Sequence, residues 1–222
     1  MANETLSPSQ AKSILNETEK IMNNLQNKIL IKNNEFIEKL RQIWEDFNAV
    51  EFIKSHKINM ESLLCNLGTN TSHFGDTVVD IANSYAKVGG NIISVGTIGK
   101  LIKPDIDISK VQDHFADGES GDEFGFRNPE SGASQTMDAF NNLKNEISQL
   151  MTEAVSEINS INAFGNQNVK ANLAKSAGKI VEICEEGIKT SENSIKNLID
   201  QTAQSYIKLG TSAETAANLS SN

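Results

Sequence analysis

The stretch IANSYAKVGG, residues 81–90, decides the fold, because it has a counterpart in TAQSYIKLG, residues 202–210. Ala, Ser, Tyr, Lys and Gly recur in register at an offset of 121 positions. Apolar positions upstream coincide at the same offset, including Phe52 with Leu173, Leu67 with Ile188, Phe74 with Ile195 and Val78 with Ile199. These positions follow helical spacing, so the sequence predicts that one helical element is present twice.

The first copy is predicted to form two helices. Ser7 and Pro8 are typical of a helix start, and Gln10 is placed to complete a capping box. A stripe then advances in steps of three and four through Ile14, Thr18, Ile21, Leu25, Ile29, Lys32, Phe36, Leu40, Ile43 and Phe47. We expect the aliphatic part of the Lys32 side chain to lie along this apolar stripe while its ammonium group reaches water. After a break near 46–48, a second stripe runs through Ala49, Phe52, Ile53, Met60, Leu63, Leu67, Phe74, Val78, Ile81, Tyr85 and Val88 to Gly89-Gly90, a typical helix stop.

The second copy follows the same plan. One stripe contains Met137, Phe140, Leu143, Ile147, Leu150, Ala154, Ile158 and Ile161. The turn residues NAFGNQN follow, and a second stripe contains Val169, Leu173, Ile180, Cys184, Ile188, Ile195, Leu198, Tyr206 and Leu209. We expect that last helix to end at Gly210. Each copy is therefore predicted to be an antiparallel helical hairpin.

Between the copies the composition changes. VGGNIISVGTIGKLIKP, residues 88–104, is apolar and interrupted by glycine, and residues 101–134 contain eight acidic and three basic side chains. We predict a connecting segment there, partly flexible. The predicted fold is all-α, with two long antiparallel hairpins forming an elongated four-helix bundle. The predicted domains are 1–90, 91–134 and 135–222.

Composition narrows the function. The chain has 222 residues, 38% hydrophobic and 5% aromatic, with three prolines and a net charge of −9. This composition disfavours an all-β fold, and the negative charge argues against nucleic-acid binding. The N-terminus lacks the pattern of a Sec signal peptide, and no stretch has the roughly 20 apolar residues of a membrane helix.

No catalytic motif is found, so we predict no enzyme, no cofactor and no metal site. Phosphate-loop, nucleophile-elbow and zincin motifs are absent, as is the Glu-x-x-His pair of di-iron bundles. His56, His73 and His114 lack ligand spacing, and His56 is expected in the core or at its boundary.

Two further groups of potential ligands have simple interpretations. Asp113, Asp117 and Asp122 are expected to form a solvated acidic loop rather than a calcium site. Cys65 and Cys184 lie far apart in apolar helical contexts, so buried free thiols are predicted.

The turn IWEDFNAVEF, residues 43–52, resembles that of the WXG superfamily, the helical hairpins exported by bacterial type VII secretion systems. Trp44 ends the first helix, Ala49 and Phe52 open the second, and Tyr85 follows Trp44 by 41 residues. The likeness covers residues 1–90 best and 135–210 more weakly. Asp46 stands where the family has glycine. Gly165 takes the Trp44 position in the second copy, with Phe164 beside it as an aromatic substitute.

The resemblance implies a function without catalysis. Family members pair as dimers of hairpins, so one chain with two hairpins implies an intramolecular pseudo-dimer, with a homodimer as the alternative. It implies a secreted substrate or targeting partner of type VII secretion, exported without a Sec signal. Its partners would be a secretion ATPase, a larger toxin or another hairpin protein. Tyr85 and Tyr206 are the candidate export signal, although Gly89 and Gly210 stand where the family has an acidic residue.

Two alternatives stay open. An α-helical pore-forming toxin component would use segment 88–102 at a membrane interface, with Ile92, Ile93, Val95, Ile98, Leu101 and Ile102 as the contacting residues. A plain structural bundle is the other alternative. In that case Trp44 and the two tyrosines would simply pack at the ends of the bundle.

Overall fold

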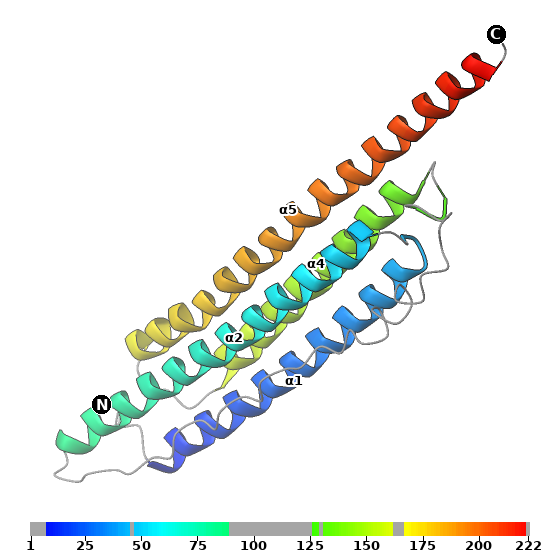
Figure 1. Ribbon diagram of the computed structural model, residues 1–222. Coiled ribbons are helices and arrows are strands. Elements are labelled where there is room, and N and C mark those ends of the chain that lie inside the picture. Colours follow the sequence, from blue (N-terminus) through cyan, green and yellow to red (C-terminus); the bar gives the residue numbers. More distant parts are fainter. Residues whose placement is uncertain (1–7, 45–46, 89–125, 129–130, 162–166, 221–222) are drawn as a thin grey trace. The chain divides into compact units, whose positions relative to one another are not determined.

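The computed structural model describes residues 8–44, 47–88, 126–128, 131–161 and 167–220. Over these residues the fold is all-helical, as predicted, with α1 (Pro8–Arg41), α2 (Phe47–Val88), α4 (Gly132–Ser160) and α5 (Gln167–Ser220) (Figure 1). The described part contains no strand; its single β-type pairing is an isolated antiparallel bridge between Trp44 and Phe126.

Helix α1 starts at the predicted proline and ends earlier than predicted. Pro8 occupies the first helical position, where its missing N–H costs nothing. At the other end, the backbone N–H groups of Gln42, Ile43 and Trp44 donate to carbonyls of the last turn at 2.9–3.1 Å. These bonds satisfy carbonyls that would otherwise lack partners. The chain leaves α1 at Arg41 and turns so that Trp44, 1% exposed, enters the core.

The sequence predicts the C-terminal end of α2 correctly but not that of α5. Helix α2 ends at Val88, directly before the predicted glycine stop. Helix α5 continues through Gly210 to Ser220, so the predicted stop at Gly210 is wrong. A glycine inside a helix costs only about 1 kcal/mol relative to alanine, and the following TSAETAANLS is rich in alanine and other helix-forming residues.

The chain divides into two compact units, and every helix contributes a segment to each. Unit 1 comprises residues 1–32, 61–105 and 145–187; unit 2 comprises 33–60, 106–144 and 188–222. Within each unit, segments of the four described helices lie side by side (Figure 1). The α1–α2 turn belongs to unit 2, whereas the connection from α4 to α5 belongs to unit 1. The domain boundaries predicted from composition stay predictions.

The two cores differ in chemistry. In unit 1 the core is mainly aliphatic and includes Ile14, Met22, Leu25, Ile29, Leu63, Leu64, Leu67, Val78, Ile147 and Met151. Of the buried aromatic residues in the described part of the chain, only Phe74 belongs to unit 1. The others gather in unit 2: Phe36, Trp44, Phe52, Phe126 and Phe140.

One prediction about the cysteines is wrong. Cys65 is an exposed free thiol on α2, not a buried one. Its neighbour Leu64 is fully buried, and one residue along a helix turns a side chain by about 100°, which carries Cys65 out of the core. The side chain of Cys184 lies outside the described residues.

Candidate functional site

The most distinctive site lies in unit 2, where three phenyl rings surround a buried histidine. His56 is 1% exposed and stacks on Phe52 with ring centroids 5.3 Å apart and planes 20° apart. Phe36 from α1 and Phe140 from α4 meet the imidazole edge-to-face, at centroid distances of 5.3 and 6.2 Å. Residues from three helices thus enclose the ring, and His56 is a core histidine, as expected.

Both imidazole nitrogens have polar partners. The His56 Nε2 atom lies 2.8 Å from Oδ1 of Asn33, and Nδ1 lies 3.1 Å from Oγ of Ser191. Because a carboxamide oxygen only accepts, Nε2–H is the donor of this neutral tautomer and Nδ1 accepts from the Ser191 hydroxyl. Asn59 Nδ2 donates to the same serine oxygen at 3.3 Å. We call Asn33, His56 and Ser191 the polar cluster; it connects α1, α2 and α5.

Burial controls the protonation of this histidine. Loss of hydration penalises the charged ring and lowers the pKa of His56 to about 3. His56 is therefore neutral at physiological pH. A neutral imidazole in an apolar box is a stable arrangement as long as both nitrogens stay hydrogen-bonded.

The polar cluster is not arranged for catalysis. A serine hydroxyl beside an imidazole nitrogen can form a nucleophile and its base. Here Ser191 and His56 are both 1% exposed, so a substrate has no access to either. A histidine with a strongly lowered pKa is also a weak base at neutral pH. The chemistry that remains is structural: three helices held in register by directional hydrogen bonds.

The sequence repeat shows that the polar cluster is specific to unit 2. At the offset of 121 positions, Asn33 corresponds to Ala154 and His56 to Ala177. Both alanines are buried, and both belong to unit 1. Equivalent core positions thus carry a hydrogen-bonded polar pair in one copy and two methyl groups in the other.

A second buried feature of unit 2 surrounds Trp44. Its ring lies 5.5 Å from that of Phe126 and 6.4 Å from that of Phe52, centroid to centroid. The backbone N–H of Arg127 donates to the carbonyl of Ile43 at 3.0 Å. The chain just before α4 is therefore fixed against the end of α1.

Gly132 makes that contact possible. A Cβ atom added to Gly132 would overlap the Cβ atom and the ring of Phe126. The distance from the added Cβ to the Phe126 Cδ1 atom would be only 2.8 Å. The first residue of α4 must therefore lack a side chain for Phe126 to reach Trp44.

The other residues singled out from the sequence are placed as follows. Ala49 and Phe52 are buried in unit 2, at 1% and 0% exposure. Phe164 and Gly165 lie outside the described residues, as do Asp113, Asp117, Asp122, His114 and the apolar positions of segment 88–102, which are Ile92, Ile93, Val95, Ile98, Leu101 and Ile102. Tyr85 and Tyr206 belong to α2 and α5, and their side chains are also outside the described set.

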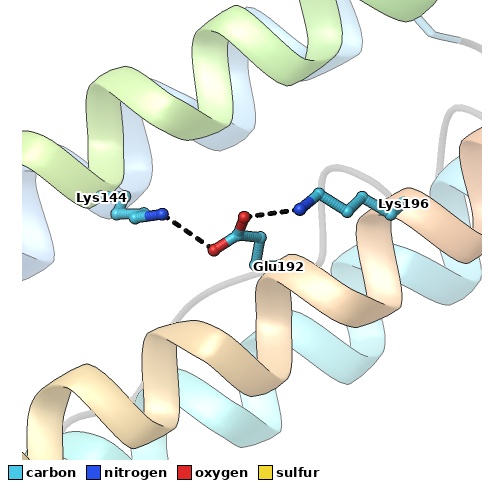
Figure 2. Close-up of polar contacts among 3 residues, drawn as sticks. All are labelled: Lys144, Glu192 and Lys196. Atoms are coloured by element: carbon cyan, nitrogen blue, oxygen red, sulfur yellow. Dashed lines mark hydrogen bonds and ion pairs between the residues drawn. The ribbon is translucent and has the colours of Figure 1, made fainter.

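Ion pairs connect helices at the surface of each unit. In unit 2, Glu192 of α5 accepts from Lys144 of α4 at 2.9 Å and from Lys196 one turn further along α5 at 2.7 Å. Figure 2 shows the carboxylate between the two ammonium groups. Hydrogen bonds from Lys196 and Lys144 lower the pKa of Glu192. In unit 1, Lys32 of α1 pairs with Glu146 of α4 at 3.4 Å.

A groove between α1 and α4 in unit 1 has a volume of about 760 Å³. Its lining is of mixed charge and polarity: Glu17, Lys20, Ile21, Asn24, Asn27, Glu157, Ser160 and Ile161. Such a lining favours no particular ligand. Across the described residues, no group of three or more His, Cys, Asp or Glu side chains could hold a metal ion. Among the same residues, no helix combines the length and apolar character that crossing a membrane requires.

Sequence reasoning missed Asn33, Ser191, Phe126 and Gly132. Asn33 carried a usable signal, because it follows Ile29 by four residues and precedes Ile37 by four. The predicted stripe used Lys32 instead, whose side chain is 35% exposed, whereas Asn33 is fully buried. Ser191, Phe126 and Gly132 gave no local signal, since each matters only through a partner distant in sequence.

The chain was also compared with known proteins. No protein-family model, no curated protein and no solved structure matches it.

Proposed function

We propose that this chain is a non-enzymatic helical protein of a bacterial type VII secretion pathway, a substrate or a targeting partner, that acts through contacts of its helices with other proteins. It is secreted without a Sec signal. Within the chain, the two sequence repeats form two antiparallel hairpins that pair as an intramolecular four-helix bundle.

The observation that carries the proposal is the mixing of the two repeats. Each unit takes segments from α1 and α2 of the first copy and from α4 and α5 of the second. Two copies that folded separately would give one unit per copy. Mixing of this kind is what a fused dimer of hairpins requires.

Contacts between α1 and α2 support the hairpin. Phe36 meets Phe52, and Asn33 bonds His56. Further back along α1, the Gln26 side chain donates to the carbonyl of Leu64 at 3.2 Å. Earlier residues of α1 thus pair with later residues of α2, as in antiparallel helices.

Contacts between α2 and α5 support the pairing of the two hairpins. Asn48 Nδ2 donates to Thr202 Oγ1 at 3.0 Å, and His56 meets Ser191. Both contacts cross from one sequence repeat to the other inside unit 2. Contacts between the repeats within one chain are what an intramolecular pseudo-dimer would use.

Size-exclusion chromatography with light scattering tests the intramolecular pairing. We expect a mass of 24.2 kDa that does not change on dilution. A stable mass of twice that value, with no monomer at low concentration, would replace the pseudo-dimer by a homodimer.

Export tests the pathway. In a bacterium that carries the gene and a type VII system, we expect the protein in the medium when the secretion ATPase is intact and only in cells when it is deleted.

Tyr85→Ala and Tyr206→Ala test the proposed export signal, and Cys65→Ser, an exposed position on α2, is the control. Normal export of both variants would show that the two tyrosines are not part of the export signal. Export without the ATPase would contradict the pathway, and leakage of liposomes by the purified chain would favour the pore-forming alternative.

A further inference from the structure

We propose that the polar cluster of Asn33, His56 and Ser191 is an acid-sensitive latch, which holds α1, α2 and α5 together in unit 2 and opens that unit when His56 takes up a proton. The inference concerns the folded chain alone, so it stands or falls independently of the proposed secretion pathway.

The geometry explains why the neutral ring closes the latch. His56 Nε2–H donates to Asn33 on α1 and Nδ1 accepts from Ser191 on α5, while the ring is part of α2. One imidazole thus uses its single donor and its single acceptor on two different helices. A protonated ring has two donors, so the Ser191 hydroxyl would have to turn its hydrogen away from Nδ1.

The larger cost is the buried charge. Fully buried rings of Phe52 and Phe140 and the nearly buried ring of Phe36 surround His56. The face of Phe52 attracts a cation weakly, but the loss of water around an uncompensated ion costs far more. The strongly lowered pKa of His56 agrees with this geometry.

No carboxylate in the described structure contacts His56 to compensate that charge. The side chains that meet the ring are neutral on every helix around it: Asn33 and Phe36 on α1, Phe52 on α2, Phe140 on α4 and Ser191 on α5.

The nearest ionisable residues along these helices sit in exposed or half-exposed positions. They are Lys32 and Glu35 on α1, Lys54 and Lys57 on α2, Asp138 and Lys144 on α4, and Lys189 and Glu192 on α5. Glu192, which follows Ser191 directly, is already held by Lys144 and Lys196. Relief of the charge therefore requires water, and water requires the helices to separate.

Unit 1 lacks this device. The repeat counterparts of Asn33 and His56 are the buried alanines Ala154 and Ala177, which do not titrate. The histidine of unit 1 in the described structure, His73, is exposed rather than buried in a core. We therefore expect mild acid to act on unit 2 and to leave unit 1 closed.

The direction and the pH range follow from proton linkage. Between the pKa of about 3 in the closed unit and the ordinary value of 6.5, the opened state binds one more proton than the closed state. Acid therefore favours opening, by about fivefold over the first pH unit below 6.5 and by close to tenfold over the next. From pH 6.5 to 5.0 the opening equilibrium constant should rise about fifteenfold, because half of the opened-state histidine is already protonated at pH 6.5. Glu192, with its lowered pKa, stays ionised over this range.

Hydrogen–deuterium exchange with mass spectrometry tests the latch on the full chain between pH 7.5 and 5.0, with each rate corrected for the intrinsic pH dependence. Peptides from residues 33–41 and 47–60 report on unit 2, and peptides from 8–32 and 61–84 report on unit 1. We expect the opening constant of unit 2 to rise about fifteenfold from pH 6.5 to 5.0 while that of unit 1 stays within about twofold.

Two variants separate the latch from general acid sensitivity. His56→Gln keeps a donor and an acceptor but cannot be charged, so its unit 2 should lose the pH response whatever its absolute stability. His73→Gln, at the exposed histidine of the same helix, should keep the wild-type response. The latch is wrong if His56→Gln keeps the wild-type slope, if the wild type shows no slope, or if both units open together.

A measurement on the wild type keeps the test valid if His56→Gln does not fold. In an NMR titration of the histidine rings, the signal of His56 in the closed state should stay at its neutral position down to pH 5. A closed-state His56 signal that moves to its protonated position above pH 5 would overturn the proposal.

Discussion

The ring of Trp44 lies 5.5 Å from the ring of Phe126, and the backbones of these two residues form the one isolated bridge in the described structure. Trp44 lies three residues beyond the end of α1 and Phe126 six residues before α4, so the contact joins the end of the first helix to the segment that leads into α4. The tryptophan that resembles a family signature thus also has a packing partner 82 residues away.

Phe126→Ala tests the importance of this contact. Phe126 is 5% exposed, and removing a buried phenyl ring costs about 3–5 kcal/mol. We expect a loss near the lower end, since only a short segment has to adjust. Urea unfolding followed by the emission of Trp44, the single tryptophan, measures the change. A matched Phe126→Leu variant should recover at least half of the loss; a Phe126→Ala variant as stable as wild type would show that the contact contributes nothing.

Glycine-to-alanine substitutions should have opposite effects at two helical positions. At Gly132, the added methyl group overlaps Phe126, and we expect a loss of about 1–3 kcal/mol in unfolding free energy. At Gly178 in α5, nothing lies within 4 Å of the added Cβ, so the gain in helix propensity of about 1 kcal/mol should appear in full. Chemical denaturation of the two variants side by side measures the difference.

Gly187 provides an intermediate case for the same experiment. A Cβ there would lie 3.2 Å from Cδ1 of Leu63, a contact that a small shift of the leucine can relieve. Gly187→Ala should therefore fall between the other two variants. A stabilised Gly132→Ala variant, or a destabilised Gly178→Ala variant, would contradict the packing described for these helices.

The helices could be predicted because their signals are local. Apolar residues at steps of three and four determine which face of α1 is buried, and glycine after Val88 marks the end of α2. The same signal failed at Gly210, where α5 continues, because one glycine costs less than the surrounding helix formers contribute. Local signals therefore predict that a helix exists better than they predict where it stops.

The polar cluster could be predicted only in part. A histidine on an apolar face suggested that His56 is buried, and it is. Asn33 was missed because the stripe was assigned to Lys32, one residue earlier, which moves the inward direction by about 100°. Ser191 lies 135 residues from His56, and only the packing of α5 against α2 brings the two side chains together.

Replacing the hydrogen-bonded pair by an apolar pair tests how Asn33 and His56 contribute. Asn33→Leu alone leaves the donor Nε2–H of His56 buried without its acceptor, which should cost about 1–3 kcal/mol. The double variant Asn33→Leu/His56→Phe removes donor and acceptor together and fits the surrounding rings. We expect it to recover part of that loss, since an apolar pair can replace a buried polar pair at little cost, whereas the Ser191 hydroxyl loses Nδ1 as its acceptor.

A double-mutant cycle in urea at pH 7.5 measures this coupling, with Asn33→Leu/His73→Gln as the matched control. Asn33 belongs to unit 2 and the exposed His73 to unit 1, so the two effects of the control pair should add. Additive effects of Asn33→Leu and His56→Phe would contradict a mutually dependent pair.

Glu192→Gln should destabilise the chain at neutral pH and lose that effect in acid. Lys196 and Lys144 lower the pKa of Glu192, so the folded state favours the carboxylate. Its contribution to stability is complete above the ordinary pKa of 4.5 and is lost as pH falls through the lower folded value. Both lysine side chains are about half exposed, so screening limits the loss to about 1 kcal/mol at pH 7.

Urea unfolding at pH 7 and pH 3 measures this difference, with Glu182→Gln, at an exposed position of the same helix, as the control. The Glu192 effect should shrink in 0.5 M salt as well, since the ammonium groups reach solvent. An equal loss at both pH values would mean that Glu192 acts through its packing rather than its charge. In that case the ion pairs seen in Figure 2 would not contribute to holding α4 against α5.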